Sequence, residues 1–166
     1  MGHPGGLVGA RDDVRLAIVR FLGIDYGERR IGLALSDVSG TLATPWRTVV
    51  VSGSAEQRLT SLLELVRELQ ASDDGLAAIV IGLPRRLDGS ATEQTGRVSE
   101  LAETLRTRTE LRVELQDERL TSREAESRLA LRDRDWRSRK AKLDAAAAAI
   151  VLQDYLDSQV NRPSGK

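Results

Sequence analysis

The stretch Phe21–Gly27, with the sequence FLGIDYG, decides the fold prediction, because an apolar run ends there in an acid and a tight turn. We expect a buried strand that ends near Asp25, a turn, and a second apolar run from Ile31. A carboxylate at the end of a buried strand loses solvation unless a cation or hydrogen bonds compensate it. Gly23 and Gly27 leave room for backbone or a ligand to come close. By itself, this pattern is equally compatible with a plain hairpin that carries a turn aspartate.

The composition of the chain excludes several kinds of active site. Because there is no cysteine, thiolate catalysis, disulfides and Cys-ligated zinc are excluded. His3 is the only histidine, which argues against a Ser–His triad and a His-ligated metal site. The 25 basic and 25 acidic residues balance, so the overall charge indicates no partner. There is no apolar run of about 18 residues that would predict a membrane span, and no apolar signal core near the N-terminus.

Hydrophobic patterns along the chain predict the order β-β-β-α-β-α-β-α-α. The expected strands are 21–26, 31–36, 46–51, 76–83 and 111–115, and the first two form an antiparallel hairpin. Helices are expected after the caps Ser54, Thr92 and Thr121, and a last, alanine-rich helix from about Leu143 to Gln159. This order favours an α/β fold with a mixed five-stranded sheet and helices on both faces.

The length of 166 residues indicates one domain, which we expect to span residues 21–160. Residues 1–20 begin with a Gly-rich, unpatterned stretch. We expect them to be a disordered or non-native extension, of the kind that a translation start chosen too far upstream would add. Residues 161–166 are expected to form a flexible tail.

Three acidic residues are expected where ordered segments end or begin. Asp25 closes the first strand, Glu118 follows the strand 111–115, and Asp144 opens the alanine-rich helix. Each has a plain structural interpretation: a turn aspartate, a solvated turn, and a helix-start acid favoured by the helix dipole. Together they favour a ligand site, because ligands of open α/β sheets collect at the carboxyl ends of the strands.

Three carboxylates at one edge would repel each other unless divalent cations bind between them. Oxygen ligands favour Mg²⁺ or Mn²⁺, and two such ions about 3.5–4 Å apart can activate water and stabilise the leaving oxygen of a phosphodiester. The alanines at 145–149 would let the last helix approach the sheet and bring Asp144 near Asp25. Since side chains alternate along a strand, Asp117 and Glu118 are expected to point to opposite faces.

Four motifs, in this order, resemble the YqgF/RuvX family. They are Gly23–Gly27 with Gly32 and Ala34; Gly82–Pro84 with Asp88, Gly89 and Gln94; Asp117–Thr121; and Lys142 with Asp144 before the alanines. The resemblance covers about residues 21–158. It implies an RNase H-like fold related to RuvC Holliday junction resolvases, in cytoplasmic bacterial proteins regarded as candidate nucleases for the 5′ end of pre-16S rRNA. It also implies that the family's acidic positions, catalytic and metal-binding, fall on Asp25, Glu118 and Asp144.

Basic residues gather in the segment 119–142, which holds nine Lys or Arg and four Asp or Glu, a local net charge of +5. Such a segment suits contacts with phosphates, although arginine-rich helix faces are often only solvated. The resemblance also implies that the loop after Gly82 approaches nucleic acid. We therefore expect six nucleic-acid contacts: Arg85, Arg86, Arg119, Arg134, Arg137 and Arg139.

The leading hypothesis is a nuclease that depends on Mg²⁺ or Mn²⁺ and acts on structured RNA such as pre-rRNA. Resolution of branched DNA is a second hypothesis, which usually needs a symmetric dimer. Nucleotide binding is a third, because Gly-x-Asp-x-Gly also resembles the phosphate loop of actin-like and sugar-kinase proteins, although those need two such domains. A non-catalytic RNA-binding assembly factor is the fourth. We expect a cytoplasmic monomer or weak homodimer with no membrane partner.

Overall fold

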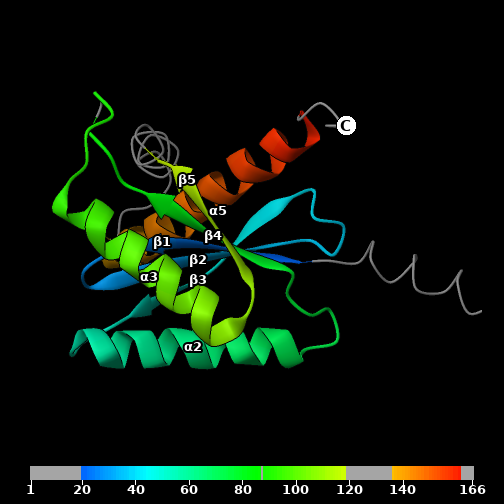
Figure 1. The fold of residues 1–166 in the computed structure, drawn as a ribbon, viewed down its shortest axis with the longest axis horizontal. Coiled ribbons are helices and arrows are strands. Elements are labelled where there is room, and N and C mark those ends of the chain that lie inside the picture. The colour runs from blue at the N-terminus through cyan, green and yellow to red at the C-terminus, as the bar shows by residue number, and fades with distance from the viewer. Residues whose placement is uncertain (1–19, 87, 119–135, 162–166) are drawn as a thin grey trace, which may run out of the picture.

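The computed structural model describes residues 20–86, 88–118 and 136–161, and for 136–140 it gives the backbone alone. Its elements are β1 (Phe21–Tyr26), β2 (Arg30–Ser36), β3 (Ala43–Val50), α2 (Ala55–Ala71), β4 (Ala78–Leu83), α3 (Glu93–Thr109), β5 (Arg112–Asp117) and α5 (Trp136–Val160). They form a five-stranded sheet in the order β3-β2-β1-β4-β5 (Figure 1). β1 pairs antiparallel with β2 and parallel with β4, so the sheet is mixed. The predicted fold class is confirmed.

The local sequence signals explain how the first elements form. In the β1–β2 hairpin, Asp25 lies opposite Gly32. α2 begins after Ser54 and α3 begins after Thr92, each with the reciprocal hydrogen bonds of a capping box. β4 is buried along its whole length, as expected for a central strand with parallel neighbours. These caps and apolar runs could therefore be read directly from the sequence.

The two faces of the sheet are covered differently (Figure 1). α2 and α3 cover one face, where Leu and Val side chains of both helices pack against the strands in the larger core cluster. This cluster includes Leu22, Ile24, Leu33, Ile79, Ile81, Leu63, Val66, Val98 and Leu105. α5 crosses the other face and forms a smaller cluster with Ala34 and Val80. Each fully buried aliphatic side chain contributes about 1.5–3 kcal/mol relative to an exposed one.

Glycine lets α5 lie close to the sheet. A Cβ added to Gly23 would come within 2.8 Å of Leu152 Cβ and 2.9 Å of the Ala148 backbone oxygen. A Cβ added to Gly32 would overlap the backbone oxygen of Asp144. On the helix side, Ala148 is fully buried. The predicted close approach of the alanine-rich helix is confirmed.

α5 differs from the prediction in its start. The 25-residue helix begins at Trp136, seven residues before the predicted start, so Asp144 lies in the helix interior and the helix-start interpretation of this acid is wrong. The sequence before Leu143 is charged and has no apolar period, yet Arg and Lys are good helix formers, so the first turns gave no signal. None of the helices that the structure describes is both long and apolar enough to cross a membrane.

β3 also starts earlier than predicted, at Ala43 instead of Trp46. Pro45 lies within this earlier start, and β3 is an edge strand, where proline is tolerated. The pairing with β2 shifts register at this point, between Leu33 and Ala34. The predicted N-terminal extension, C-terminal tail and helix after Thr121 lie outside the described residues.

Replacing Gly32 with alanine should destabilise the fold, because the new methyl group would push α5 away from β2. We expect a loss of about 1–3 kcal/mol in the free energy of unfolding, measured by urea denaturation. Gly96 is the matched control: it lies inside α3 with no atom near its added Cβ. Gly96→Ala should instead gain about 0.5–1 kcal/mol. Equal stabilities for Gly32→Ala and wild type would contradict the close packing of α5.

Candidate active site

Asp25 lies between two glycines of neighbouring strands, near the end of β1. Gly32 of β2 is directly opposite. On the other side, Ile24 pairs with Ile81, so Gly82 of β4 comes next to Asp25. Neither glycine has a side chain, which leaves space beside the Asp25 carboxylate on the face that α5 covers.

The Glu118 carboxyl group and the backbone of Asp144 use that space. A Cβ on Gly82 would overlap Oε2 of Glu118, and a Cβ on Gly32 would overlap the backbone oxygen of Asp144. The charge of Asp144 and a hydrogen bond with Glu118 both act on Asp25. The structure thus brings the carboxyl groups of Asp25 and Glu118 into hydrogen-bond contact and places Asp144 of α5 near enough for its charge to act on Asp25.

Asp25 and Glu118 form a carboxyl pair that shares a proton. Burial raises the pKa of Asp25 to about 6, the charge of Asp144 raises it as well, and the hydrogen bond with Glu118 opposes the rise. Burial raises the pKa of Glu118 to about 8, and the charges of Asp25 and Asp117 and the hydrogen bond with Asp25 add to it. At neutral pH the protonated Glu118 therefore donates to the Asp25 carboxylate.

Asp144 has a different partner. Its Oδ2 accepts a hydrogen bond from Nε of Arg30 at 2.7 Å, and the two side chains are 24% and 33% exposed. Arg30 was not among the predicted site residues. The only signal in the sequence was its place in the turn before the second predicted strand, five positions after Asp25.

The turn after Asp25 is fixed from the opposite side of the sheet. Gln94 Nε2 donates to the Tyr26 carbonyl at 2.6 Å, and Arg58 Nη2 donates to the Gly27 carbonyl at 2.6 Å. Within the turn, the Gly27 N–H donates to the Arg30 carbonyl at 3.0 Å. These bonds hold the strand end that carries Asp25.

Of the two neighbouring acids Asp117 and Glu118, the family resemblance favours Glu118 as the site residue. Asp117 ends β5 in register with Leu83, and the Glu118 N–H donates to the Leu83 carbonyl at 3.3 Å. Glu118 hydrogen-bonds Asp25. The structure therefore places Glu118 beside Asp25, and its role as a metal ligand stays a prediction.

The structure does not test the six predicted nucleic-acid contacts. Arg85 and Arg86 are exposed in the loop after β4. Arg119 and Arg134 lie outside the described residues, and Arg137 and Arg139 fall where only the α5 backbone is given. A role for all six stays a prediction.

The donor set of this site suits a hard divalent cation, since it offers only carboxylate oxygens. The shared proton between Asp25 and Glu118 also fits, because such a cation replaces the protons of the acids it binds. Over 20–86, 88–118 and 136–161, however, no three acidic or histidine side chains are arranged to hold an ion. Asp144 faces Arg30 in this conformation.

Residues 19–158 match the model of the family described as RuvX, Holliday junction resolvase. The chain belongs to the RuvX family. Relatives named "Putative pre-16S rRNA nuclease" in Leifsonia xyli subsp. xyli and Thermus thermophilus are 40% and 41% identical over 146 and 133 residues. These matches cover 87% and 80% of this chain, and 90% and 93% of the relatives.

The solved structures agree with this family assignment at the level of the fold. Thermus thermophilus RuvC is similar with a TM-score of 0.52 at 16% identity, over 86% of this chain and 96% of RuvC. At this identity the likeness shows a shared RNase H-like fold. The fold and family that the four motifs predicted for this RuvX-family chain are confirmed.

The shared proton predicts an unusual pH dependence of stability without metal. Burial, with the neighbouring acids, raises the pKa of Glu118 from its ordinary 4.5 to about 8 in the folded chain, so folding takes up a proton between these limits. Stability in EDTA should therefore fall as pH rises from about 4.5 to 8. Glu118→Gln stays neutral, so above pH 8 it should exceed wild type by about 1–3 kcal/mol in free energy of unfolding.

Urea denaturation in EDTA at pH 5, 6.5 and 8.5 would measure this difference. Glu64→Gln is the control, because Glu64 is exposed on α2 and should keep the wild-type slope. Parallel pH profiles for wild type and Glu118→Gln would show that Glu118 does not hold the proton.

Proposed function

We propose that this RuvX-family protein is a metal-dependent nuclease that hydrolyses phosphodiester bonds. The observation that carries the proposal is the Asp25–Glu118 pair, which shares a proton beside the third carboxylate, Asp144. These groups offer oxygen ligands alone, and the chain has no cysteine and no histidine besides His3. The set suits cation-assisted hydrolysis better than nucleophilic catalysis by a side chain.

Each of these side chains has a distinct proposed role. Asp25 and Glu118 would hold Mg²⁺ or Mn²⁺ after they lose the shared proton. Asp144 would complete the ligand set on leaving Arg30, which then becomes available to a phosphate oxygen of the substrate. The bound cation would supply the positive charge that activates water and stabilises the leaving oxygen.

The relatives favour RNA as the substrate. Proteins 40% and 41% identical to this chain are named for pre-16S rRNA, which supports a role in processing that precursor. We propose that the processing concerns its 5′ end and takes place in the bacterial cytoplasm. The family description names a Holliday junction resolvase, so a DNA four-way junction is the second candidate. The exposed Arg85 and Arg86, next to the end of β4, suit the backbone of either nucleic acid.

Asp25→Asn should abolish cleavage while leaving the fold intact, because the amide keeps the shape but loses the charge that holds the cation. We expect the rate with Mn²⁺ to fall by at least about 100-fold, a loss of several kcal/mol of transition-state stabilisation. Cleavage of a 5′ pre-16S fragment, single-stranded RNA and a DNA four-way junction would be compared with Mg²⁺, Mn²⁺ or EDTA. Asp73→Asn is the control, since Asp73 is exposed in the loop after α2.

The three substrates separate the candidate functions. Preferred cleavage of the precursor supports rRNA processing, and preferred cleavage of the junction supports resolution. Binding of RNA without cleavage under any metal would favour the non-catalytic assembly factor. A folded Asp25→Asn protein that cleaves like wild type would rule out Asp25 as a metal ligand.

A further inference from the structure

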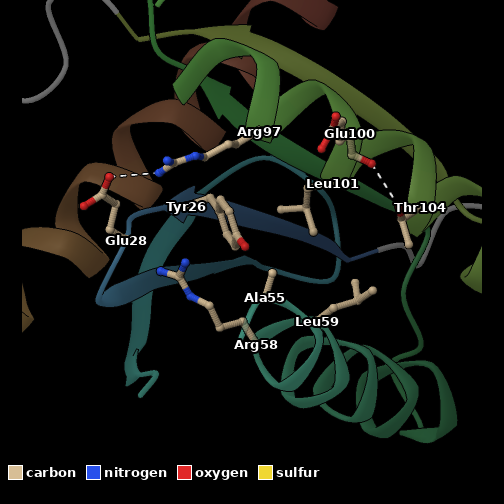
Figure 2. A pocket seen from close by; sticks show the side chains of 9 residues that line it. All are labelled: Tyr26, Glu28, Ala55, Arg58, Leu59, Arg97, Glu100, Leu101 and Thr104. Carbon is tan, nitrogen blue, oxygen red and sulfur yellow. Dashed lines mark hydrogen bonds and ion pairs between the residues drawn. The ribbon is translucent and has the colours of Figure 1, made fainter. Parts of the chain in front are cut away.

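A separate cavity lies on the other side of the sheet, between α2 and α3, and we call it the α2–α3 pocket (Figure 2). Its volume of about 620 Å³ is within the usual range of small-molecule sites, about 300–1,000 Å³. Tyr26 lies at its centre and packs with the core cluster under α2 and α3. Asp25, the residue before it, is on the face covered by α5, so the pocket is distinct from the carboxylates.

Arg58 of α2 brings an incompletely satisfied positive charge to this pocket. Its Cζ lies 5.3 Å from the centre of the Tyr26 ring, and its Nη2 donates to the Gly27 carbonyl at 2.6 Å. Its Nε is buried and has no hydrogen-bond partner, and among the ion pairs of the described residues none includes Arg58. A buried donor of a charged group without an acceptor is costly, which favours an anionic ligand.

Arg97 of α3 adds a second guanidinium at the same end of the pocket. Its Nη1 lies 2.9 Å from Oε1 of Glu28, and Figure 2 shows it reaching toward the β1–β2 turn. The two side chains are 50% and 71% exposed, so solvent weakens this ion pair and it can be exchanged. A phosphate could therefore take the place of Glu28 and bind both arginines. A guanidinium can hold a phosphate through two parallel hydrogen bonds, which are stronger than hydrogen bonds between neutral groups.

The rest of the pocket suits the organic part of such a ligand. Leu59 and Leu101 extend the apolar wall beside Tyr26, and Figure 2 places Glu100 at the end away from Glu28. An aromatic and aliphatic wall packs against planar rings, and a carboxylate accepts hydrogen bonds from hydroxyl or amino groups. A phosphate, a planar ring and hydroxyl donors occur together in a nucleotide.

We propose that the α2–α3 pocket binds a nucleoside monophosphate unit. Its phosphate lies between Arg58 and Arg97, its base packs against Tyr26 and the leucines, and Glu100 accepts from its sugar or base. This unit comes either as a free nucleotide or as one nucleotide of an RNA strand. The proposal does not depend on whether the carboxylates cleave a phosphodiester.

Calorimetric titration of the full chain in EDTA tests the proposal, because EDTA keeps cations away from the carboxylates. The probes are AMP, adenosine, inorganic phosphate and a tetra-adenylate RNA. AMP or the tetranucleotide should bind at least about tenfold tighter than adenosine or phosphate alone. Arg97→Ala and Arg58→Lys should each weaken binding by about tenfold, since the fork of donors that holds a phosphate is lost or shortened.

Arg67→Ala and Arg108→Ala are matched controls, because both arginines are exposed on the same two helices outside the pocket and should leave binding unchanged. Asp25→Asn should also leave it unchanged. Arg97 is exposed, so its variant keeps the test valid if Arg58→Lys does not fold.

Binding by the tetranucleotide alone identifies the strand as the source of the nucleotide. No binding by either nucleotide probe, equal binding by phosphate, or binding insensitive to Arg58 and Arg97 would overturn the proposal.

Discussion

Helix α5 can lie against the sheet only because the strands beneath it carry glycine. A Cβ on Gly23 or Gly32 would meet the helix backbone. Gly32 is also the antiparallel partner of Asp25, so one residue connects the position of the helix with that of the acid. On the other side of Asp25, Gly82 leaves the space that the Glu118 carboxyl occupies. The acids therefore meet because backbone packing places them there, against their mutual repulsion.

The chain compensates this repulsion in two separate ways. A proton held by Glu118 removes one negative charge beside Asp25, and Arg30 neutralises the third acid, Asp144. Both arrangements can be reversed: the proton is lost as pH rises, and the ion pair is partly exposed. A divalent cation bound to these acids would neutralise their charges in place of both the proton and Arg30. Functional sites are expected to make the fold less stable locally. A ligand that binds the folded state there restores the stability.

The sequence predicted those parts of the fold and site that depend on local pattern. Asp25 was found because an acid at the end of an apolar strand is unusual, and Ser54 and Thr92 because capping residues act within one turn. Glu118 was found at a strand end, and the family resemblance favoured it over its neighbour Asp117. Arg30 was missed because its partner is 114 positions away, and that contact exists only after α5 has packed. The start of α5 was missed since its first turns carry no apolar period. The α2–α3 pocket was missed because its arginines resemble ordinary solvated helix residues.

The carboxylate site and the α2–α3 pocket both include residues from the end of β1. Consecutive strand residues point to opposite faces, so Asp25 and Tyr26 share one strand end but serve different surfaces. The bonds that fix this strand end come from the Tyr26 side: Arg58 and Gln94 hold the carbonyls of Gly27 and Tyr26. Arg58 also carries a buried donor, Nε, that has no hydrogen-bond partner. Arg58 therefore contacts both the α2–α3 pocket and the turn that follows Asp25, although the pocket and the carboxylates lie on opposite faces of the sheet.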